Sequence, residues 1–313
     1  MAYVKVPSLA KLNLDLRVLH KRPDGYHELR TIFQTISLSD ELAIDFNFAK
    51  RTQFDLESSV EIPDNLLIRA GKAVLEFLRV KAIVRFVLRK RIPMGAGLGG
   101  GSSNAAAVLI ALPALAGRRL SLTDLGRLGE SLGSDVPFFL HGGTALGLGR
   151  GTELYPLPDQ PERAALVVST GIHVSTSEAY RALGRNSNVT NKLTSSVESR
   201  MLGEFQEIAW NLHRPSLHHL PVKNDFEGAV FEKHRELAAT ARKLRRLGAK
   251  PAMMTGSGSA VFGVFPSVSD ARMAAGSFPA GSAYPTRFIS RRRYRALWQR
   301  ALGPAAEASC FSG

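Results

Sequence analysis

Apolar and polar residues alternate along several early segments of the chain. Within Leu12–Leu19 the alternation continues as far as Val18, which predicts a strand with one buried face. Similar short patterns predict further strands at Val4–Val6, Glu28–Leu38, Glu41–Phe46 and Ala82–Leu88. The first half of the chain is therefore expected to contain a β-sheet.

Two other segments of the first half have helical spacing. Apolar residues recur every three or four positions in Asn65–Phe77, which predicts a helix with Asp64 as its N-cap. A Ser-x-x-Asp pattern beginning at Ser121 resembles a capping box and predicts a helix over Leu122–Leu132, with Gly133 as its stop. Helices and strands are thus mixed in this half.

The second half shows the same mixture. An apolar run predicts a strand at Ala164–Val168, and Glu227–Leu247 reads as one long helix or a broken pair. Met254–Phe265 reads as a glycine-serine turn followed by a strand. Residues past about Gly303 are expected to be frayed. Three prolines lie in the mostly polar stretch Pro156–Arg163, as is typical of a linker. We therefore place the domain boundary there, between residues 158 and 159.

Composition restricts the class of protein. The chain has 313 residues, of which 44% are hydrophobic, enough for a substantial core. A single cysteine, Cys310, argues against an internal disulfide framework and a cysteine-based zinc site, and fits a reducing, cytoplasmic location. No apolar run has the length to span a bilayer, and the first residues lack the apolar core of a signal peptide, so no membrane association is expected.

The chain is strongly basic, with a formal net charge of +14. The positive residues concentrate in Arg242–Lys250 and Arg291–Arg295. A basic surface attracts nucleic acids or small polyphosphates, but a solvated helix face is the commoner explanation. No RNA-binding or zinc-finger signature accompanies these charges, so nucleic-acid binding is not expected. The sequence assigns no function to the arginine-rich segment near the C-terminus.

The most informative segment is glycine-rich and lies between a predicted strand and an apolar helix over Ala105–Leu112. Glycines permit positive φ and let the backbone approach a ligand closely. A helix start adds free N–H groups and the positive end of the helix dipole, which together bind anions, usually phosphates. The glycines of this loop are Gly95, Gly97, Gly99, Gly100 and Gly101.

This loop differs from two common phosphate-binding motifs. The P-loop has a lysine directly after its glycines, whereas Ser102 and Ser103 stand here. A dinucleotide-binding loop is followed, about 20 residues on, by an acidic residue that holds a ribose. Gly117, Arg118 and Arg119 occupy that distance, so this interpretation is disfavoured.

Phosphoryl transfer also needs a cation and a group that accepts the proton of the attacking hydroxyl. Lys11 lies among apolar residues of a predicted strand, and Asp135 precedes an apolar run. Taken singly, Lys11 is more simply a lysine that reaches solvent, and Asp135 a helix N-cap. If both face the glycine loop, Lys11 neutralises charge near the acceptor and Asp135 accepts the proton.

Three ordered motifs resemble those of the GHMP kinase superfamily, which includes galactokinase, homoserine kinase, mevalonate kinase and phosphomevalonate kinase. They are Pro7–Leu14, the loop Pro93–Ser103, and Met254–Gly263. Three further stretches are similar to the branch whose acceptor is a cytidine-diphosphate-linked methylerythritol of the non-mevalonate route to isoprenoids. These are Lys21–Leu29, Gly133–Pro137 and Asn224–Glu227. Six motifs in the right order are far more specific than any one.

The resemblance implies an α+β fold in two domains. Residues 1–158 would form an ATP-binding half similar to ribosomal protein S5 domain 2, and residues 159–313 a C-terminal α/β sandwich half with a basic tail. The activity implied is transfer of a phosphoryl group from ATP to the 2-hydroxyl of the substrate. Mg²⁺ is implied because ATP arrives as its magnesium salt, but no protein ligand for the metal is assigned.

The resemblance also implies roles for individual residues. Lys11 and Asp135 match the catalytic pair, and Asn13 a position near the acceptor hydroxyl. Tyr26 and Tyr180 match aromatic residues on the two faces of the cytosine, and His27 matches the residue that reads its edge. Tyr180 replaces a more usual phenylalanine and would still stack. The ATP site would comprise Asn65 at the adenine and Pro93, Met94, Gly95, Ala96, Gly97, Leu98, Gly99, Gly100, Gly101, Ser102 and Ser103 at the phosphates.

Ser103 is the preferred contact for the phosphates or the metal, with helix capping as its alternative role. Two other functions stay open: a GHMP kinase of the mevalonate or homoserine type, and a non-catalytic nucleic-acid-binding protein. The sequence does not distinguish a monomer from a homodimer.

Overall fold

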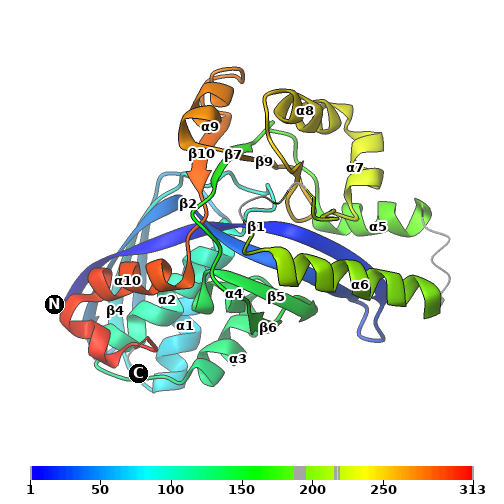
Figure 1. Cartoon of the computed structure of the whole chain (residues 1–313). Coiled ribbons are helices and arrows are strands. Elements are labelled where there is room, and N and C mark those ends of the chain that lie inside the picture. The colour runs from blue at the N-terminus through cyan, green and yellow to red at the C-terminus, as the bar shows by residue number, and fades with distance from the viewer. Residues whose placement is uncertain (1, 187–194, 215–216, 218, 312–313) are drawn as a thin grey trace.

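The computed structural model describes residues 2–186, 195–214, 217 and 219–311, and consists of two sheets with helices packed against them (Figure 1). The first sheet contains β1 (Ala2–Lys21), β2 (His27–Phe48), β3 (Gln53–Ser58), β4 (Ala82–Arg89), β5 (Thr144–Gly149) and β6 (Glu153–Pro156). The second contains β7 (Ala164–Val168), β8 (Ala252–Met254), β9 (Val261–Phe265) and β10 (Ala283–Arg287). The α+β class predicted from the sequence is confirmed.

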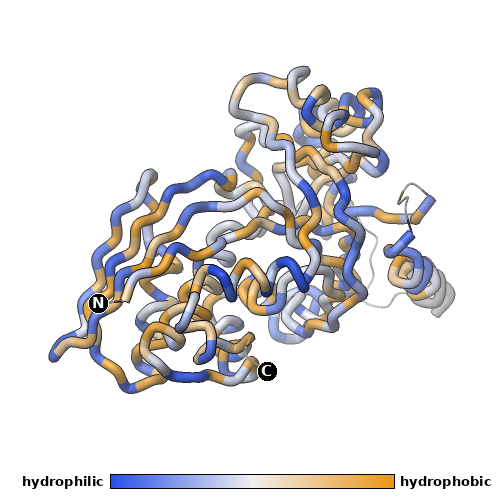
Figure 2. Tube along the Cα trace, turned by 60° about the vertical axis from the view of Figure 1, so that its left-hand side comes forward, coloured by the Kyte–Doolittle hydropathy of each residue, from blue (hydrophilic) through white to orange (hydrophobic). Residues whose placement is uncertain are grey.

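Two long strands organise the first sheet. β1 and β2 pair antiparallel from Ala2↔Phe46 to Lys21↔His27, so the four short strands predicted there are two long ones. On its other side β2 pairs with β4 and, further along, with β5. Figure 2 shows the alternation of apolar and polar residues along these strands. This alternation buries one face of the sheet against helices.

Three helices cover that face: α1 (Leu66–Leu78), α2 (Gly100–Leu115) and α3 (Leu122–Leu132). Every residue of α2 from Ser103 to Ala114 is buried, which explains its lack of a polar face. The short helix α4 (Val136–His141) follows α3 and packs into the same core.

The starts of two helices test the predicted caps. Ser121 caps α3 by accepting a hydrogen bond from the Asp124 N–H, and α3 ends at Gly133, as predicted. The predicted cap of α1 is wrong by one residue. The Asn65 side chain accepts from the Leu67 N–H, whereas Asp64 has φ = +48° and lies outside the helix.

The second sheet is antiparallel in the order β10-β7-β9-β8. Helices α8 (Arg235–Arg246) and α9 (Val268–Ala275) cover one of its faces. Helix α7 (Glu227–Lys233) is separate from α8, so the predicted alternative of a broken pair is confirmed. Helix α5 (Thr176–Asn186) packs against α7.

The opposite face of the second sheet packs against the first half of the chain. Ala165 and Val167 of β7 share an apolar core with Leu12 and Leu14 of β1. Helix α6 (Ser195–Asn211) contributes Phe205 and other residues to the same core. The boundary expected between residues 158 and 159 falls between β6 and β7 and stays a prediction.

The C-terminal segment returns to the first sheet (Figure 1). Helix α10 (Arg291–Leu302) buries Tyr294, Trp298 and Leu302 in the core beneath that sheet, followed by the 3-10 helix η1 (Gly303–Ala308). Phe311 packs against the same core, so the expectation of a frayed end beyond Gly303 is wrong for the described residues. Among them, no helix combines the length and apolar content needed to cross a bilayer.

Candidate active site

The glycine loop connects β4 to α2 and touches the second domain. Gly97 has φ = +75°, and a Cβ there would lie 2.3 Å from the carbonyl oxygen of Thr255. Only glycine fits this approach. Helix α2 begins directly after Gly99, which has φ = +70° and no side chain to cap the helix. The first N–H groups of α2 are therefore available to an anionic ligand.

Lys11 and Asp135 come together beside this loop. The Lys11 backbone N–H donates to the Leu98 carbonyl at 3.0 Å, which ties β1 to the loop. The side chain of Lys11 is only 3% exposed, and its Nζ lies 3.3 Å from Asp135 Oδ2. Lys11 therefore does not reach solvent, and the simpler interpretation of this residue is wrong.

Asp135 occupies the N-cap position of α4 but does not cap it. Its side chain makes no hydrogen bond to the helix N–H groups and reaches Lys11 instead. The carboxylate stays one-third exposed and lines a cavity. The structural role that the sequence favoured for Asp135 alone, helix capping, is thus wrong.

A buried polar network surrounds the Lys11 ammonium group. Lys11 Nζ donates to Asn13 Oδ1 at 2.6 Å, and Asn13 Nδ2 donates to Thr31 Oγ1 at 2.8 Å. The Asn13 N–H donates to Thr255 Oγ1 at 3.0 Å. Sequence reasoning selected Asn13 but missed Thr31 and Thr255, because their partners come from distant segments.

Two cavities meet at this point. The larger, of about 600 Å³, is lined by Lys11, Asp135 and Tyr180, among other residues of both domains. The smaller, of about 320 Å³, lies along the glycine loop. Gly95, Gly97 and Ser102 line both cavities. The smaller cavity includes all of the expected ATP-site residues except Ser103.

Ser103 lies behind the loop. Its side chain is buried and accepts a hydrogen bond from Ser8 Oγ at 3.1 Å. It lines neither cavity and does not cap α2, whose N-cap is Gly99. The neighbouring Ser102 is the loop serine that lines both cavities. Ser102, rather than the expected Ser103, is therefore placed to contact a ligand there.

The wall of the smaller cavity rests on a buried carboxylate that sequence reasoning missed. Asp40 of β2 accepts hydrogen bonds from the N–H groups of Arg91 at 2.8 Å and Ile92 at 2.9 Å. Its other oxygen accepts from Lys90 Nζ and, at 3.0 Å, from Asn104 Nδ2. Asp40 thereby joins the start of the glycine loop to helix α2.

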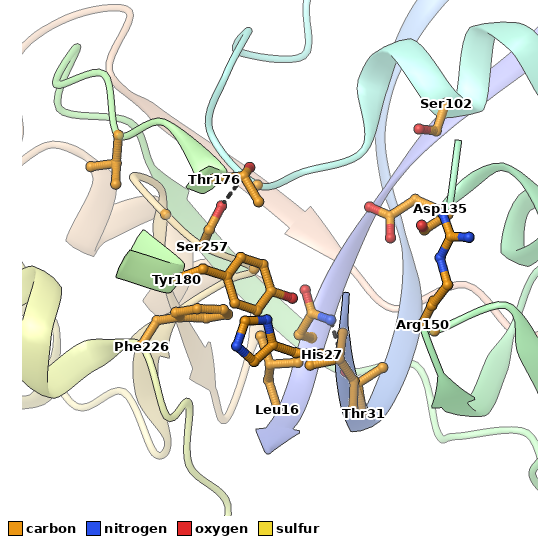
Figure 3. Close-up of a pocket in the computed structure, with 18 of the residues that line it drawn as sticks. Leu16, His27, Thr31, Ser102, Asp135, Arg150, Thr176, Tyr180, Phe226 and Ser257 are labelled. Carbon is orange, nitrogen blue, oxygen red and sulfur yellow. Dashed lines mark hydrogen bonds between the residues drawn. The ribbon is translucent and has the colours of Figure 1, made fainter. Parts of the chain in front are cut away.

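Aromatic side chains line the far end of the larger cavity (Figure 3). The His27 and Tyr180 rings stack with centroids 4.6 Å apart, and Tyr180 meets Phe226 edge-on at 4.9 Å. The centroid of the Tyr26 ring lies 3.5 Å from the guanidinium carbon of Arg150, another cavity residue that sequence reasoning missed.

Burial changes the titration of this aromatic pair. Desolvation, together with the charges of Lys21 and His20, lowers the pKa of His27. Desolvation, with a smaller contribution from the Asp135 charge, raises the pKa of Tyr180 to about 12. At neutral pH the pocket therefore contains an uncharged imidazole and an uncharged phenol.

The fold and the two cavities define the class of GHMP kinases, and both halves of the chain match it. The model of the GHMP kinases N terminal domain matches residues 65–143, and that of the GHMP kinases C terminal domain matches residues 201–279. A solved homoserine kinase from Cytophaga hutchinsonii, 18% identical, shares the fold with a TM-score of 0.71 over 93% of this chain and 95% of its own.

Relatives of higher identity narrow the class. The 4-diphosphocytidyl-2-C-methyl-D-erythritol kinase of Solibacter usitatus is 52% identical over 94% of this chain and 92% of its own. The 4-diphosphocytidyl-2-C-methyl-D-erythritol kinase of Moorella thermoacetica is 38% identical over 93% of this chain and 99% of its own. A crystal structure of 4-(cytidine 5'-diphospho)-2C-methyl-D-erythritol kinase is 36% identical in sequence. It matches this fold with a TM-score of 0.75 over 91% of this chain and 98% of its own. The chain belongs to the 4-diphosphocytidyl-2-C-methyl-D-erythritol kinase family.

Proposed function

We propose that this protein transfers the γ-phosphoryl group of ATP to the 2-hydroxyl of 4-diphosphocytidyl-2-C-methyl-D-erythritol, a step of isoprenoid precursor synthesis. The family supports the reaction, and one observation carries its assignment to this site. The Lys11–Asp135 contact lies where a cavity along the glycine loop meets a cavity with an aromatic end. A donor and an acceptor in these cavities would meet at those two side chains.

In the proposed reaction the acceptor oxygen forms a bond to the γ-phosphorus as the bond to the leaving ADP oxygen breaks. Asp135 accepts the proton of the hydroxyl, and the Lys11 ammonium group stabilises negative charge on the transferred group. Asn13 accepts a hydrogen bond from Lys11 Nζ and so holds the ammonium group near the acceptor. Ser102 and the N–H groups at the start of α2 bind the phosphates.

The adenine is proposed to lie at Asn65 in the smaller cavity. Asn65 Oδ1 is already used as the cap of α1, whereas its buried Nδ2 has no hydrogen-bond partner among the described residues. A buried amide donor without a partner is costly unless a ligand accepts from it. An acceptor nitrogen of adenine is a suitable ligand.

The cytosine is proposed to bind at the aromatic end of the larger cavity. A neutral His27 has one donor and one acceptor for the cytosine edge, and Tyr26 and Tyr180 have faces on which the base can stack. The His27 and Tyr180 rings are too close to admit a base between them, so His27 must leave its stack on Tyr180. Arg150 adds a positive charge that suits the diphosphate.

Mg²⁺ is proposed to enter as part of the ATP substrate. The Ser102 hydroxyl is a hard oxygen donor that lines both cavities, and such a ligand suits this ion. Among the described residues no three His, Cys, Asp or Glu side chains cluster as a metal site. The ion would therefore rely on phosphate oxygens and water for its other ligands, as Mg²⁺ commonly does.

The remaining proposals concern partners and location. We propose that the protein acts only on small molecules and has no nucleic-acid or membrane partner. We also propose that it works in the cytoplasm as a monomer or a homodimer. The free thiol of Cys310 is compatible with a reducing compartment. A mevalonate or homoserine acceptor is disfavoured because neither has a base to use the aromatic end of the cavity.

The test is a phosphorylation assay with ATP, Mg²⁺ and each of three acceptors: the cytidine diphosphate compound, mevalonate and homoserine. We expect turnover with the first alone and competition by cytidine nucleotides. In Asp135→Asn, turnover should fall roughly 1,000-fold with ATP affinity within about twofold of the original. Turnover of mevalonate or homoserine instead of the cytidine compound would contradict the proposed function. Normal turnover in Asp135→Asn would contradict the role of Asp135.

A further inference from the structure

The position of Asp135 depends on the short helix α4. Asp135 stands directly before Val136, the first residue of α4, and its carboxylate contacts Lys11 rather than the helix. Residues 136–140 of α4 are all buried. A displacement of this helix would therefore move Asp135 relative to the Lys11 ammonium group.

Tyr294 of helix α10 holds the other end of α4. Its hydroxyl donates a hydrogen bond to the Phe139 carbonyl oxygen, and its ring is buried against Gly142, where α4 stops. A Cβ at Gly142 would lie 2.3 Å from Tyr294 Cδ1, so only glycine permits this contact. The Tyr294 hydroxyl thus satisfies a carbonyl at the helix end, where such groups lack helical partners.

Helix α10 is itself fixed at the end that carries Tyr294. The Asp159 carboxylate accepts from the N–H groups of Arg291 at 2.6 Å and Arg292 at 3.3 Å. The Arg291 guanidinium donates to the carbonyls of Leu157 and Thr144. Thr144 begins β5, just after α4. The arginine-rich segment therefore anchors α10 to the start of β5 and to the segment that follows β6.

The same helix supports the glycine loop. The Phe139 ring packs on Gly99, where a Cβ would lie 2.9 Å from the ring and 3.1 Å from Lys11 Cγ. Phe139 therefore links the carbonyl held by Tyr294 to the start of α2 at Gly99, which the stem of Lys11 also approaches. One small helix thus touches the loop, the lysine and the aspartate.

We propose that Tyr294 is a positioning residue for phosphoryl transfer, which acts by holding α4 so that Asp135 faces the acceptor hydroxyl. The inference rests on the proposed role of Asp135. It gives the basic C-terminal helix a function in the active site, although the helix contributes no residue to either cavity.

Tyr294→Phe tests this inference because it removes the hydroxyl and keeps the ring that packs on Gly142. We expect kcat to fall about tenfold, since small misplacements of reacting groups are costly. KM for ATP and for the cytidine substrate should change less than twofold. The matched control is Tyr284→Phe, which removes a hydroxyl bound to the Gly281 carbonyl at 2.6 Å in the second domain, and should leave kcat unchanged.

A double-mutant cycle separates positioning from general stability. In the Asp135→Asn background, Tyr294→Phe should reduce the residual kcat by less than twofold, because its effect acts through the Asp135 carboxylate. Equal losses in both backgrounds, or normal kcat in Tyr294→Phe, would overturn the inference. If Asp135→Asn alone abolishes turnover while Tyr294→Phe is fully active, the proposed function stands and only the role of Tyr294 fails.

Discussion

The two cavities of the site differ in how the chain builds them. The smaller is lined only by residues between 62 and 104, most of them in one continuous run. The larger takes residues from β1 and β2, the glycine loop, the start of α4 and three separate segments of the second domain. A phosphate site can be built from one loop because its ligand is bound by backbone N–H groups. An acceptor site with a base and a specific side chain needs groups from many places.

The difference predicts which changes will affect one cavity and which will affect both. Gly97 lines both cavities and contacts Thr255 of the second domain, so it couples them. Asp40 supports the smaller cavity alone, and His27 belongs to the larger. Variants at these three positions should therefore separate the two halves of the site.

The largest effect is expected for Gly97→Ala. The new Cβ would meet the Thr255 carbonyl oxygen in a backbone conformation that alanine rarely adopts. Strain and overpacking together should lower kcat/KM for both substrates roughly a hundredfold. Gly126→Ala in helix α3, outside both cavities, is the control. Nothing lies within 4 Å of a Cβ there, so kinetics near normal are expected, and a loss equal to that of Gly97→Ala would refute the contact argument.

A smaller and selective effect is expected for Asp40→Asn. The variant keeps an oxygen for the loop N–H groups but loses the charge and the second oxygen, which accepts from Lys90 Nζ and Asn104 Nδ2. The ATP site should therefore loosen. KM for ATP should rise about tenfold, with KM for the cytidine substrate unchanged in steady-state kinetics. Asp55→Asn, at an exposed ion pair with Arg85, should change neither constant. Equal rises of both KM values would show that Asp40 does not serve the ATP cavity alone.

The smallest effect concerns pH. Because burial lowers the pKa of His27, the imidazole stays neutral above its ordinary pKa of about 6.5 and gains a proton only at lower pH. KM for the cytidine substrate should be constant from pH 8 to about 6.5 and then rise a few-fold towards pH 5. KM for ATP should show no such rise. His27→Asn should remove the pH dependence, and an unchanged profile in this variant would assign it to another group.

Local signals in the sequence predicted local structure well. The cap at Ser121, strand β4 and the helix that follows the glycine loop each depend on neighbouring residues, and each is confirmed. Errors arose where distant segments decide the outcome. The C-terminal end is ordered because Trp298 and Phe311 pack into the first domain's core, which no pattern near residue 303 indicates.

The candidate site divides in the same way. The glycine loop could be found from its own residues, whereas the pairing of Lys11 with Asp135 was expected from family resemblance. Thr31 and Asp40 have no distinguishing sequence signal, and Thr255 lies in a family motif that by itself assigns it no role. Their importance comes from the hydrogen bonds they make across the fold. The stacking of Tyr26 and Tyr180 on the two faces of the cytosine stays a prediction. In the structure the Tyr26 ring packs on Arg150 and the Tyr180 ring on His27.

Strand β1 also determines how separable the two halves of the molecule are. Val4 and Val6 belong to the core of the first sheet, whereas Leu12 and Leu14 complete the core shared with the second. A fragment that begins at residue 159 would leave the apolar face of β7 and β9 open to water. We therefore expect the two halves to unfold together as one cooperative unit. A chimera that exchanges the second half must keep the apolar surface of β1 as well.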